Sequence, residues 1–120
     1  MKEEEIYDIE KDFKMTLGVM RKESPKVMEA FLNLLRSVSQ GGILSAKEKE
    51  LISLGIALYA RCEPCIILHT KSAIEAGATK EELIEACAVA LMMGGSPTTT
   101  YMATFLKAFE TFSKKPSSFR

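Results

Sequence analysis

The sequence predicts an all-α fold, a bundle of six helices that forms one domain over residues 1–120. Apolar residues recur three and four positions apart, which is the spacing of a helix with one buried face. Glycine pairs and serine–proline pairs divide the chain at short intervals, and both are typical of helix ends. No segment carries a convincing strand pattern, so we expect helices joined by short connections.

The first two predicted helices precede residue 45. The first covers residues 3–20, with an apolar stripe formed by Ile6, Ile9, Phe13, Leu17 and Met20. The second begins at Ser24-Pro25, a capping serine followed by proline at the first helical position, and ends at Gly41-Gly42. We expect its apolar side chains to face inward; they are Val27, Phe31, Leu34, Leu35 and Val38.

The third predicted helix covers residues 46–60 and begins at a capping box, Ser45-x-x-Glu48. It is apolar on more than one side, which predicts a central position or a contact between subunits; the residues are Leu51, Leu54, Ile56 and Leu58. A fourth helix starts around Pro64. It ends at Gly77, which suits the left-handed position after a helix.

A second capping box, Thr79-x-x-Glu82, begins a fifth helix that reaches Met93. Met92 and Met93 are interpreted as side chains that fill gaps in the core. Ser96-Pro97 repeats the serine–proline start and begins a sixth helix, after which residues 113–120 are expected to form a tail.

Composition argues against two classes of partner. Sixteen basic and sixteen acidic residues leave a net charge of zero, and binding to nucleic acid or an anionic membrane needs a concentrated positive field. The N-terminus has no signal-peptide pattern, and the longest apolar stretch, "LISLGIALYA", has ten residues where a bilayer span needs about 20. We therefore expect a soluble, cytoplasmic protein, and a purely structural disulfide is disfavoured in that compartment.

Two of the three cysteines and the only histidine lie in "ARCEPCIILH", residues 60–69. Proline fits only the first turn of a helix, so the simplest interpretation makes Glu63 the cap and Cys65 the second helical residue. Cys62 is the alternative cap. A thiol in either place lies near unpaired N–H groups at the positive end of a helix, and both favour the thiolate. The sequence does not decide which sulfur is the more acidic.

The spacing of these residues is compatible with a reversible disulfide. Residues three apart on a helix have Cβ atoms about 5–6 Å apart, whereas a disulfide needs about 3.8 Å. Cys62 can close this gap only from a non-helical position at the helix start. His69 is one turn beyond Cys65 and can hold or pass a proton, which suits attack on a peroxide or a disulfide.

Metal binding and inert packing are the alternatives. A zinc site would need Cys62, Cys65, His69 and a fourth ligand, which Cys87 or an acidic residue could supply, yet the chain has no second C-x-x-C and no second histidine. Cys87 lies among small apolar residues and is expected to be buried and inert. A thioredoxin-type site is excluded because no βαβ pattern surrounds the motif. Redox chemistry is favoured, and no metal or cofactor is expected.

Residues 45–110 resemble the carboxymuconolactone decarboxylase superfamily, specifically its alkylhydroperoxidase D-like branch. The resemblance is carried by Glu50, Cys62, Cys65 and His69, spaced E-x11-C-x2-C-x3-H, and by the continuation "HTKSAIEAGATKEELIEACAVALMMGG". The best-known members have a histidine between the cysteines, where this chain has Glu63 and Pro64.

The resemblance implies a thiol-dependent peroxidase or disulfide reductase whose helical protomers assemble into a symmetric homotrimer or homohexamer. Cys65 would be the peroxidatic cysteine and Cys62 the resolving one. Glu50 and His69 would relay the proton from Cys65, although Glu50 alone, in "AKEKE", looks like an ordinary solvated carboxylate. The substrate would be a hydroperoxide, and a dithiol or lipoyl-type donor would recycle the pair.

Two further functions remain open from the sequence. One is lactone decarboxylation, with His69 as general acid–base and no redox turnover. The other is a zinc-bound or structural oligomer that binds a partner.

Overall fold

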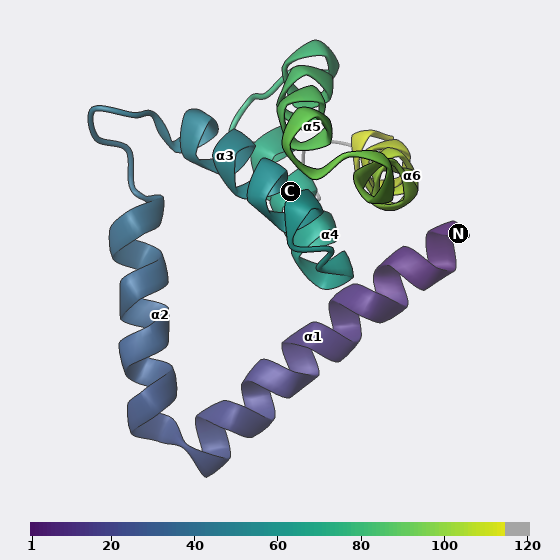
Figure 1. The fold of residues 1–120 in the computed structure, drawn as a ribbon. Coiled ribbons are helices and arrows are strands. Elements are labelled where there is room, and N and C mark those ends of the chain that lie inside the picture. Colours follow the sequence, from purple (N-terminus) through teal and green to yellow (C-terminus); the bar gives the residue numbers. More distant parts are fainter. Residues whose placement is uncertain (115–120) are drawn as a thin grey trace.

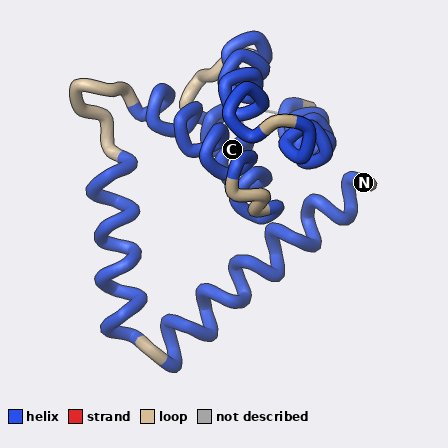
Figure 2. The backbone as a smooth tube through the Cα atoms, viewed as in Figure 1, coloured by secondary structure: helices blue, strands red, loops and turns tan. Residues whose placement is uncertain are grey.

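The computed structural model describes residues 1–114, which form six helices and no strand (Figures 1 and 2). The helices are α1 (Glu3–Glu23), α2 (Pro25–Ser39), α3 (Ala46–Tyr59), α4 (Glu63–Glu75), α5 (Lys80–Gly94) and α6 (Ser96–Ser113). The predicted all-α fold is confirmed. The predicted tail of residues 113–120 begins too early, because Ser113 is the last residue of α6; from residue 115 onward the tail lies outside the described residues. None of these helices is long and apolar enough to cross a membrane.

Helices α3 to α6 enclose the main core, with α3 in contact with each of the other three. The fully buried residues of this core include Leu54 and Leu58 of α3, Ile66 of α4, Leu83 of α5 and Phe105 of α6. The central position predicted for α3 is therefore confirmed. The same helix also has an outward side, because Ile56 is largely exposed.

The N-terminal half of α1 closes a second, smaller core against α4 and α6. Its buried members are Ile6, Ile67, Ala108 and Phe112. An ion pair reinforces this contact, since Lys71 Nζ of α4 donates to Glu10 Oε2 of α1 over 2.8 Å. One end of α1 is thus fixed to the body of the protein.

The two predicted capping boxes are present. Ser45 Oγ accepts from the Glu48 N–H at 3.0 Å, and Glu48 Oε1 accepts from the Ser45 N–H at 2.8 Å. Thr79 and Glu82 make the equivalent pair at 3.1 and 2.9 Å. Each box satisfies two N–H groups that the first turn of a helix would leave unpaired.

Two predicted helix starts are wrong by one residue. Helix α4 is capped by Cys62 and begins at Glu63, so Glu63 is not the cap. Helix α6 is capped by Gly95, at φ +70°, and begins at Ser96. In both helices proline occupies the second helical position, which it tolerates because N–H groups in the first turn have no intrahelical partner.

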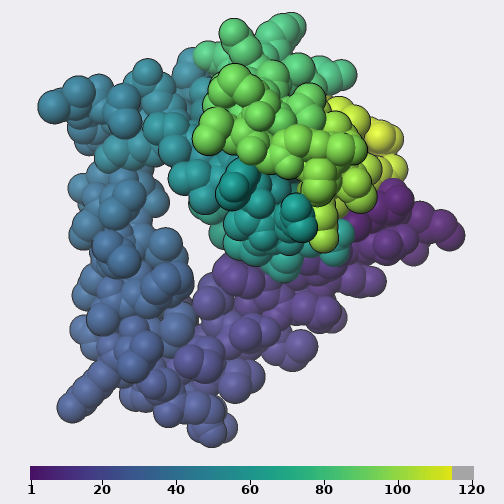
Figure 3. Space-filling model, viewed as in Figure 1, coloured from purple at the N-terminus to yellow at the C-terminus, as the bar shows by residue number. Residues whose placement is uncertain are grey.

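The prediction that the apolar stripe of α2 faces inward is wrong. Figures 1 and 3 show α1 and α2 forming a V whose tip projects from the body, with open space between α2 and the other helices. Met28 is the one buried residue of α2. The stripe is 43–60% exposed; its members are Val27, Phe31, Leu34, Leu35 and Val38. An amphipathic pattern predicts that a face will be covered, but it does not identify what covers it.

The interpretation of Met92 and Met93 as core residues is also wrong. They lie at the end of α5 and are 73% and 69% exposed. Methionine is common in cores and at adaptable binding surfaces alike, so residue type alone could not place them.

Helices α3 and α5 are also linked by a contact that depends on pH. Lys47 Nζ of α3 donates to Glu82 Oε2 of α5 over 2.9 Å. The Lys47 ammonium and the Thr79 backbone N–H hold the pKa of the Glu82 carboxyl below its usual 4.5. A carboxyl whose pKa is lowered by folding contributes stability that is fully present above its unfolded-state pKa and is lost as the pH falls through the lower, folded-state pKa.

Unfolding in urea should therefore become easier between pH 5 and pH 3, and Glu82→Gln should make this decline shallower. Lys47→Met should act in the same direction because it removes the main cause of the lowered pKa. Fluorescence- or circular-dichroism-monitored urea titrations across this range measure the slopes. Identical slopes in wild type and Glu82→Gln would contradict this assignment.

Candidate active site

The turn between α3 and α4 brings the two cysteines to the start of α4. Arg61 has φ +57°, the left-handed conformation that normally favours glycine. In this conformation the Arg61 N–H donates a hydrogen bond to the Leu58 carbonyl, and the Cys62 N–H donates one to the Ala57 carbonyl, both at 3.1 Å. This pair of bonds is the Schellman ending of a helix, and it fixes the backbone of Cys62 directly after α3.

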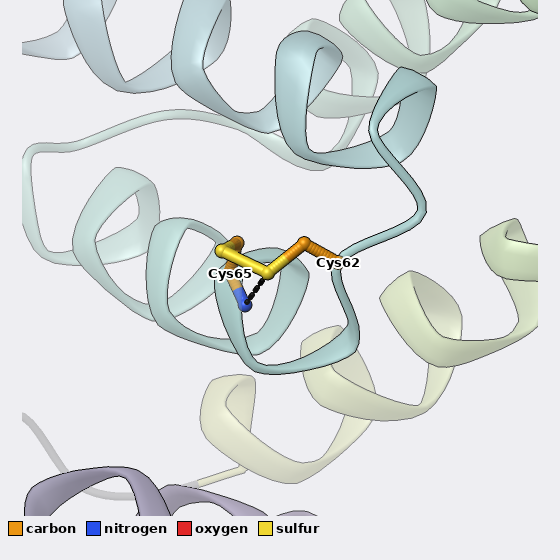
Figure 4. The surroundings of a disulfide bond; sticks show 2 residues. All are labelled: Cys62 and Cys65. Atoms are coloured by element: carbon orange, nitrogen blue, oxygen red, sulfur yellow. Dashed lines mark hydrogen bonds between the residues drawn. A yellow bond between two sulfur atoms is a disulfide. The ribbon is translucent and has the colours of Figure 1, made fainter. Parts of the chain in front are cut away.

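Cys62 is extended, with φ −101° and ψ 99°, and caps α4. Its Sγ accepts a hydrogen bond from the Cys65 N–H at 3.3 Å (Figure 4). Cys62 and Cys65 form a disulfide with their Cα atoms 5.2 Å apart. The geometric expectation is confirmed: the extended position of Cys62 lets two residues three apart in sequence pair.

Glu50 and His69 meet across the interface of α3 and α4. His69 Nδ1 lies 2.8 Å from Glu50 Oε2. Both side chains are mostly buried, with 29% of His69 and 16% of Glu50 exposed. An ionised carboxylate only accepts hydrogen bonds, so it holds the ring proton on Nδ1 and leaves Nε2 as a proton acceptor. Glu50 is therefore not the solvated carboxylate that the sequence "AKEKE" suggests by itself.

The four residues singled out by the sequence therefore form two pairs on α3 and α4, Glu50 with His69 and Cys62 with Cys65. Cys65 and His69 share one face of α4, one turn apart, and Glu50 reaches that histidine from α3. Cys62 is joined to Cys65 by the disulfide. The arrangement couples a dithiol to a proton acceptor, which is what thiolate chemistry requires.

Two features near the cysteines were not found from the sequence. Glu63 Oε2 accepts a hydrogen bond from Thr104 Oγ1 of α6 at 3.3 Å, and Thr104 is buried. This contact ties the first residue of α4 to a helix 41 positions later. No local pattern could have paired them. The left-handed Arg61 also had no sequence signal, because arginine rarely occupies that conformation.

Cys87 takes no part in this arrangement. It is fully buried in the main core, and burial raises the pKa of its thiol to about 12. It is therefore protonated at neutral pH and a poor nucleophile, as predicted. Within residues 1–114 no group of three or more His, Cys, Asp and Glu side chains is positioned to hold a metal ion. The proposed zinc set of Cys62, Cys65, His69 and Cys87 is not brought together there.

The Arg61 turn makes a stability prediction. A non-glycine residue in the left-handed region costs about 1–2 kcal/mol. Substitution by glycine removes this cost, but glycine also loses more conformational entropy on folding, which offsets part of the stabilisation. Arg61→Gly should therefore raise the free energy of unfolding by up to about 1 kcal/mol. Arg61→Val should lower it, because a β-branched residue tolerates positive φ poorly.

Chemical denaturation of the three proteins measures these differences. Gly77 occupies the equivalent position after α4, at φ +94°, so Gly77→Ala serves as a destabilising reference. An Arg61→Gly protein less stable than wild type would show that the arginine side chain supplies a stabilising contact larger than the backbone cost.

The chain matches known proteins over most of its length. The model of the carboxymuconolactone decarboxylase family matches residues 25–108. An uncharacterised protein of Cupriavidus necator is 34% identical over 93 residues, 78% of this chain and 82% of the relative. One of Methanocaldococcus jannaschii is 32% identical over 95 residues, 79% of this chain and 83% of the relative.

Two solved structures share the fold. A carboxymuconolactone decarboxylase family protein of Legionella pneumophila superposes with a TM-score of 0.87 at 38% identity, covering 91% of this chain and 97% of that one. A family member of Thermotoga maritima, described as having a possible role in the antioxidative response, has a TM-score of 0.80 at 28% identity, covering 88% and 90%. The predicted relationship is confirmed, and the chain belongs to the carboxymuconolactone decarboxylase family.

Proposed function

We propose that the protein is a thiol-dependent hydroperoxide reductase of the alkylhydroperoxidase D-like branch. The observation that carries the proposal is a Cys62–Cys65 disulfide whose second cysteine shares a helix face with the Glu50–His69 pair. Membership of the family supports it, as does the antioxidative role suggested for the Thermotoga relative. The same site would also reduce a suitable disulfide.

The first step oxidises Cys65. His69 Nε2 takes the thiol proton, with Glu50 holding the ring through Nδ1. The Cys65 thiolate attacks one peroxide oxygen, the O–O bond breaks, and the alkoxide takes a proton and leaves as an alcohol. Cys65 becomes a sulfenic acid.

The second step forms the disulfide. The Cys62 thiol attacks the sulfenic sulfur of Cys65, and the hydroxyl leaves as water. The position of Cys62 supports this step, because in the disulfide its sulfur accepts the Cys65 N–H in the first turn of α4. The two cysteines have then supplied two electrons, and the hydroperoxide has been reduced to alcohol and water.

A dithiol donor completes the cycle. A donor thiolate attacks Cys65 Sγ and expels the Cys62 thiolate. Cys62 is the better leaving group because its sulfur accepts the Cys65 N–H at the positive end of α4. The second donor thiol then releases Cys65, and the donor leaves as a disulfide. We propose a small dithiol or a lipoyl-type protein group as donor and the cytoplasm as the compartment.

Substitution of the cysteines tests the proposal. Cys65→Ser should abolish hydroperoxide consumption in the presence of dihydrolipoamide. Reduced Cys62→Ser, freed of dithiol before the assay, should consume one equivalent and stop at a sulfenic acid. Peroxide assays and mass spectrometry with a sulfenic-acid trap distinguish these results. Cys87→Ala is the matched control and should keep wild-type turnover. Equal turnover in wild type and Cys65→Ser would exclude the proposal.

The proton relay makes a separate prediction. Glu50→Gln and His69→Asn should each slow the oxidation of Cys65 about 100-fold near neutral pH, because general base catalysis contributes roughly this much or more. The loss should shrink as the pH approaches the thiol pKa, where the thiolate forms without help. Stopped-flow oxidation rates from pH 6 to pH 10 measure this. A loss that does not change with pH would assign the two residues a structural role instead.

Lactone decarboxylation is the second candidate, and the Glu50–His69 pair is the observation that favours it. A histidine oriented by a carboxylate can act as general base without any sulfur chemistry. This function predicts that a protein carrying both Cys62→Ser and Cys65→Ser turns over a carboxylated lactone at the wild-type rate while losing all peroxidase turnover.

A further inference from the structure

The backbone at the first cysteine is held from two sides. On one side, the Cys62 N–H donates a hydrogen bond to the Ala57 carbonyl at the end of α3. On the other side, the next residue, Glu63, accepts a hydrogen bond from Thr104 Oγ1 of α6 at 3.3 Å. Figure 4 shows α6 next to the first turn of α4. The contact with α6 has no part in the chemical steps proposed above.

The Glu63–Thr104 contact reaches from the start of α4 into the interior. Thr104 is 5% exposed, and Glu63 is partly buried. Thr104 precedes Phe105, a fully buried residue of the main core, so its hydroxyl is carried by a closely packed part of the fold. A buried hydroxyl needs a polar partner, and an ionised carboxylate is the stronger kind of acceptor. The contact therefore fixes the first residue of α4 to the protein interior.

The two residues between the cysteines do not by themselves favour the observed first turn of α4. Pro64 has no N–H, and proline disfavours helical angles in the residue that precedes it. Glu63 is that residue, and it is also the first helical residue of α4. Local preference thus favours a more extended Glu63, which would change the position of Cys62 relative to Cys65. The hydrogen bond from Thr104 opposes this change.

This support matters most in the reduced protein. The disulfide joins Cys62 and Cys65 only in the oxidised state. After reduction, the tendency of the two thiols to pair again depends on how closely the backbone keeps them together. Groups that are already in position lose less conformational entropy when they react. A fixed Glu63 should therefore favour the disulfide over the dithiol.

We propose that Glu63 and Thr104 are positioning residues that set the redox equilibrium of the Cys62–Cys65 pair. This inference rests on the proposed function, in which the pair cycles between dithiol and disulfide. The two residues act through the backbone of α4. By holding its first turn in place, their hydrogen bond keeps Cys62 near Cys65 after reduction and lowers the redox potential of the pair.

Two substitutions break the contact from opposite ends. Thr104→Val removes the hydroxyl and keeps the shape of the side chain, whereas Glu63→Ala removes the acceptor. Each should make the disulfide about tenfold easier to reduce, near the lower limit for losing a hydrogen bond to a charged group. A tenfold change corresponds to a rise of about 30 mV in the redox potential. The double variant should show the same rise and not twice as much, because the two side chains share one contact.

Two further variants serve as controls. Thr111→Val is the matched control on α6, because Thr111 is fully buried and its hydroxyl has no hydrogen-bond partner within residues 1–114. This substitution should leave the potential unchanged. Glu63→Gln keeps an oxygen that accepts from Thr104 but carries no charge. A neutral hydrogen bond is roughly half as strong, so Glu63→Gln should change the equilibrium about threefold.

Equilibration in redox buffers at pH 7 measures the potential. Glutathione and dithiothreitol, each supplied as thiol and disulfide, provide the range. Reduction of the protein disulfide takes two electrons and two protons from the buffer thiols, which become a disulfide. Alkylation followed by mass spectrometry counts the fraction of protein with Cys62 and Cys65 reduced. Circular dichroism and urea titration report on the fold, and Glu63→Ala provides the test if Thr104→Val does not fold.

The results separate this inference from the function on which it rests. A Cys62–Cys65 pair that stays in one state in every buffer would contradict the proposed function and the inference together. A wild-type pair that titrates, with Thr104→Val and Glu63→Ala at the potential of Thr111→Val, would overturn the inference alone. A lower urea midpoint without a shift in potential would do the same, because the contact would then support only the fold. Glu63→Gln shifted as far as Glu63→Ala would assign the effect to charge and also overturn the inference.

Discussion

The chain reversal between α3 and α4 is the constraint on which the site depends. Two hydrogen bonds, from the Arg61 and Cys62 N–H groups to carbonyls of the last turn of α3, end that helix and set the direction of the next one. Cys62 then caps α4 directly. The start of α4 is therefore fixed against the end of α3, and this position brings Cys62 and Cys65 together at the N-terminus of α4.

The close packing of α3 and α4 accounts for the chemistry. It brings Glu50, from the second turn of α3, within hydrogen-bond distance of a histidine on the second turn of α4. It also leaves the cysteine sulfurs at a helix N-terminus, where negative charge on sulfur is stabilised. The buried Cys87 has the same reactive atom without that environment, and its raised pKa makes it inert. Location in the fold, not residue type, decides which thiols can react.

Helix α3 has two sides with separate roles. One side carries Glu50 and the buried residues Leu54 and Leu58, which face the site and the core. The other side carries Gly55 and Ile56 and lines an apolar groove between α3 and α5. A helix that is apolar all round is expected to be central, and α3 is central although Ile52 and Ile56 on its outward side are exposed.

Much of this organisation could be predicted from the sequence. The six helices, two capping boxes, central α3, buried Cys87 and clustered site residues all follow from local spacing or from the family motif. Local spacing could not reveal the exposed α2 stripe, because an amphipathic pattern does not show whether the apolar face is covered within the chain. Nor could it reveal the Glu63–Thr104 contact, since those residues are 41 positions apart. The shifted start of α4 reflects the tolerance of a helix's first turn for proline.

The central claim is that Cys62 and Cys65 are a redox-active pair, and a thiol count tests it most directly. Fully reduced protein, denatured after treatment, contains three thiols. After one equivalent of hydroperoxide the account predicts one thiol, mapped to Cys87, with a Cys62–Cys65 disulfide in the peptide digest and all three thiols restored by a dithiol. Three thiols remaining after hydroperoxide treatment would contradict the account.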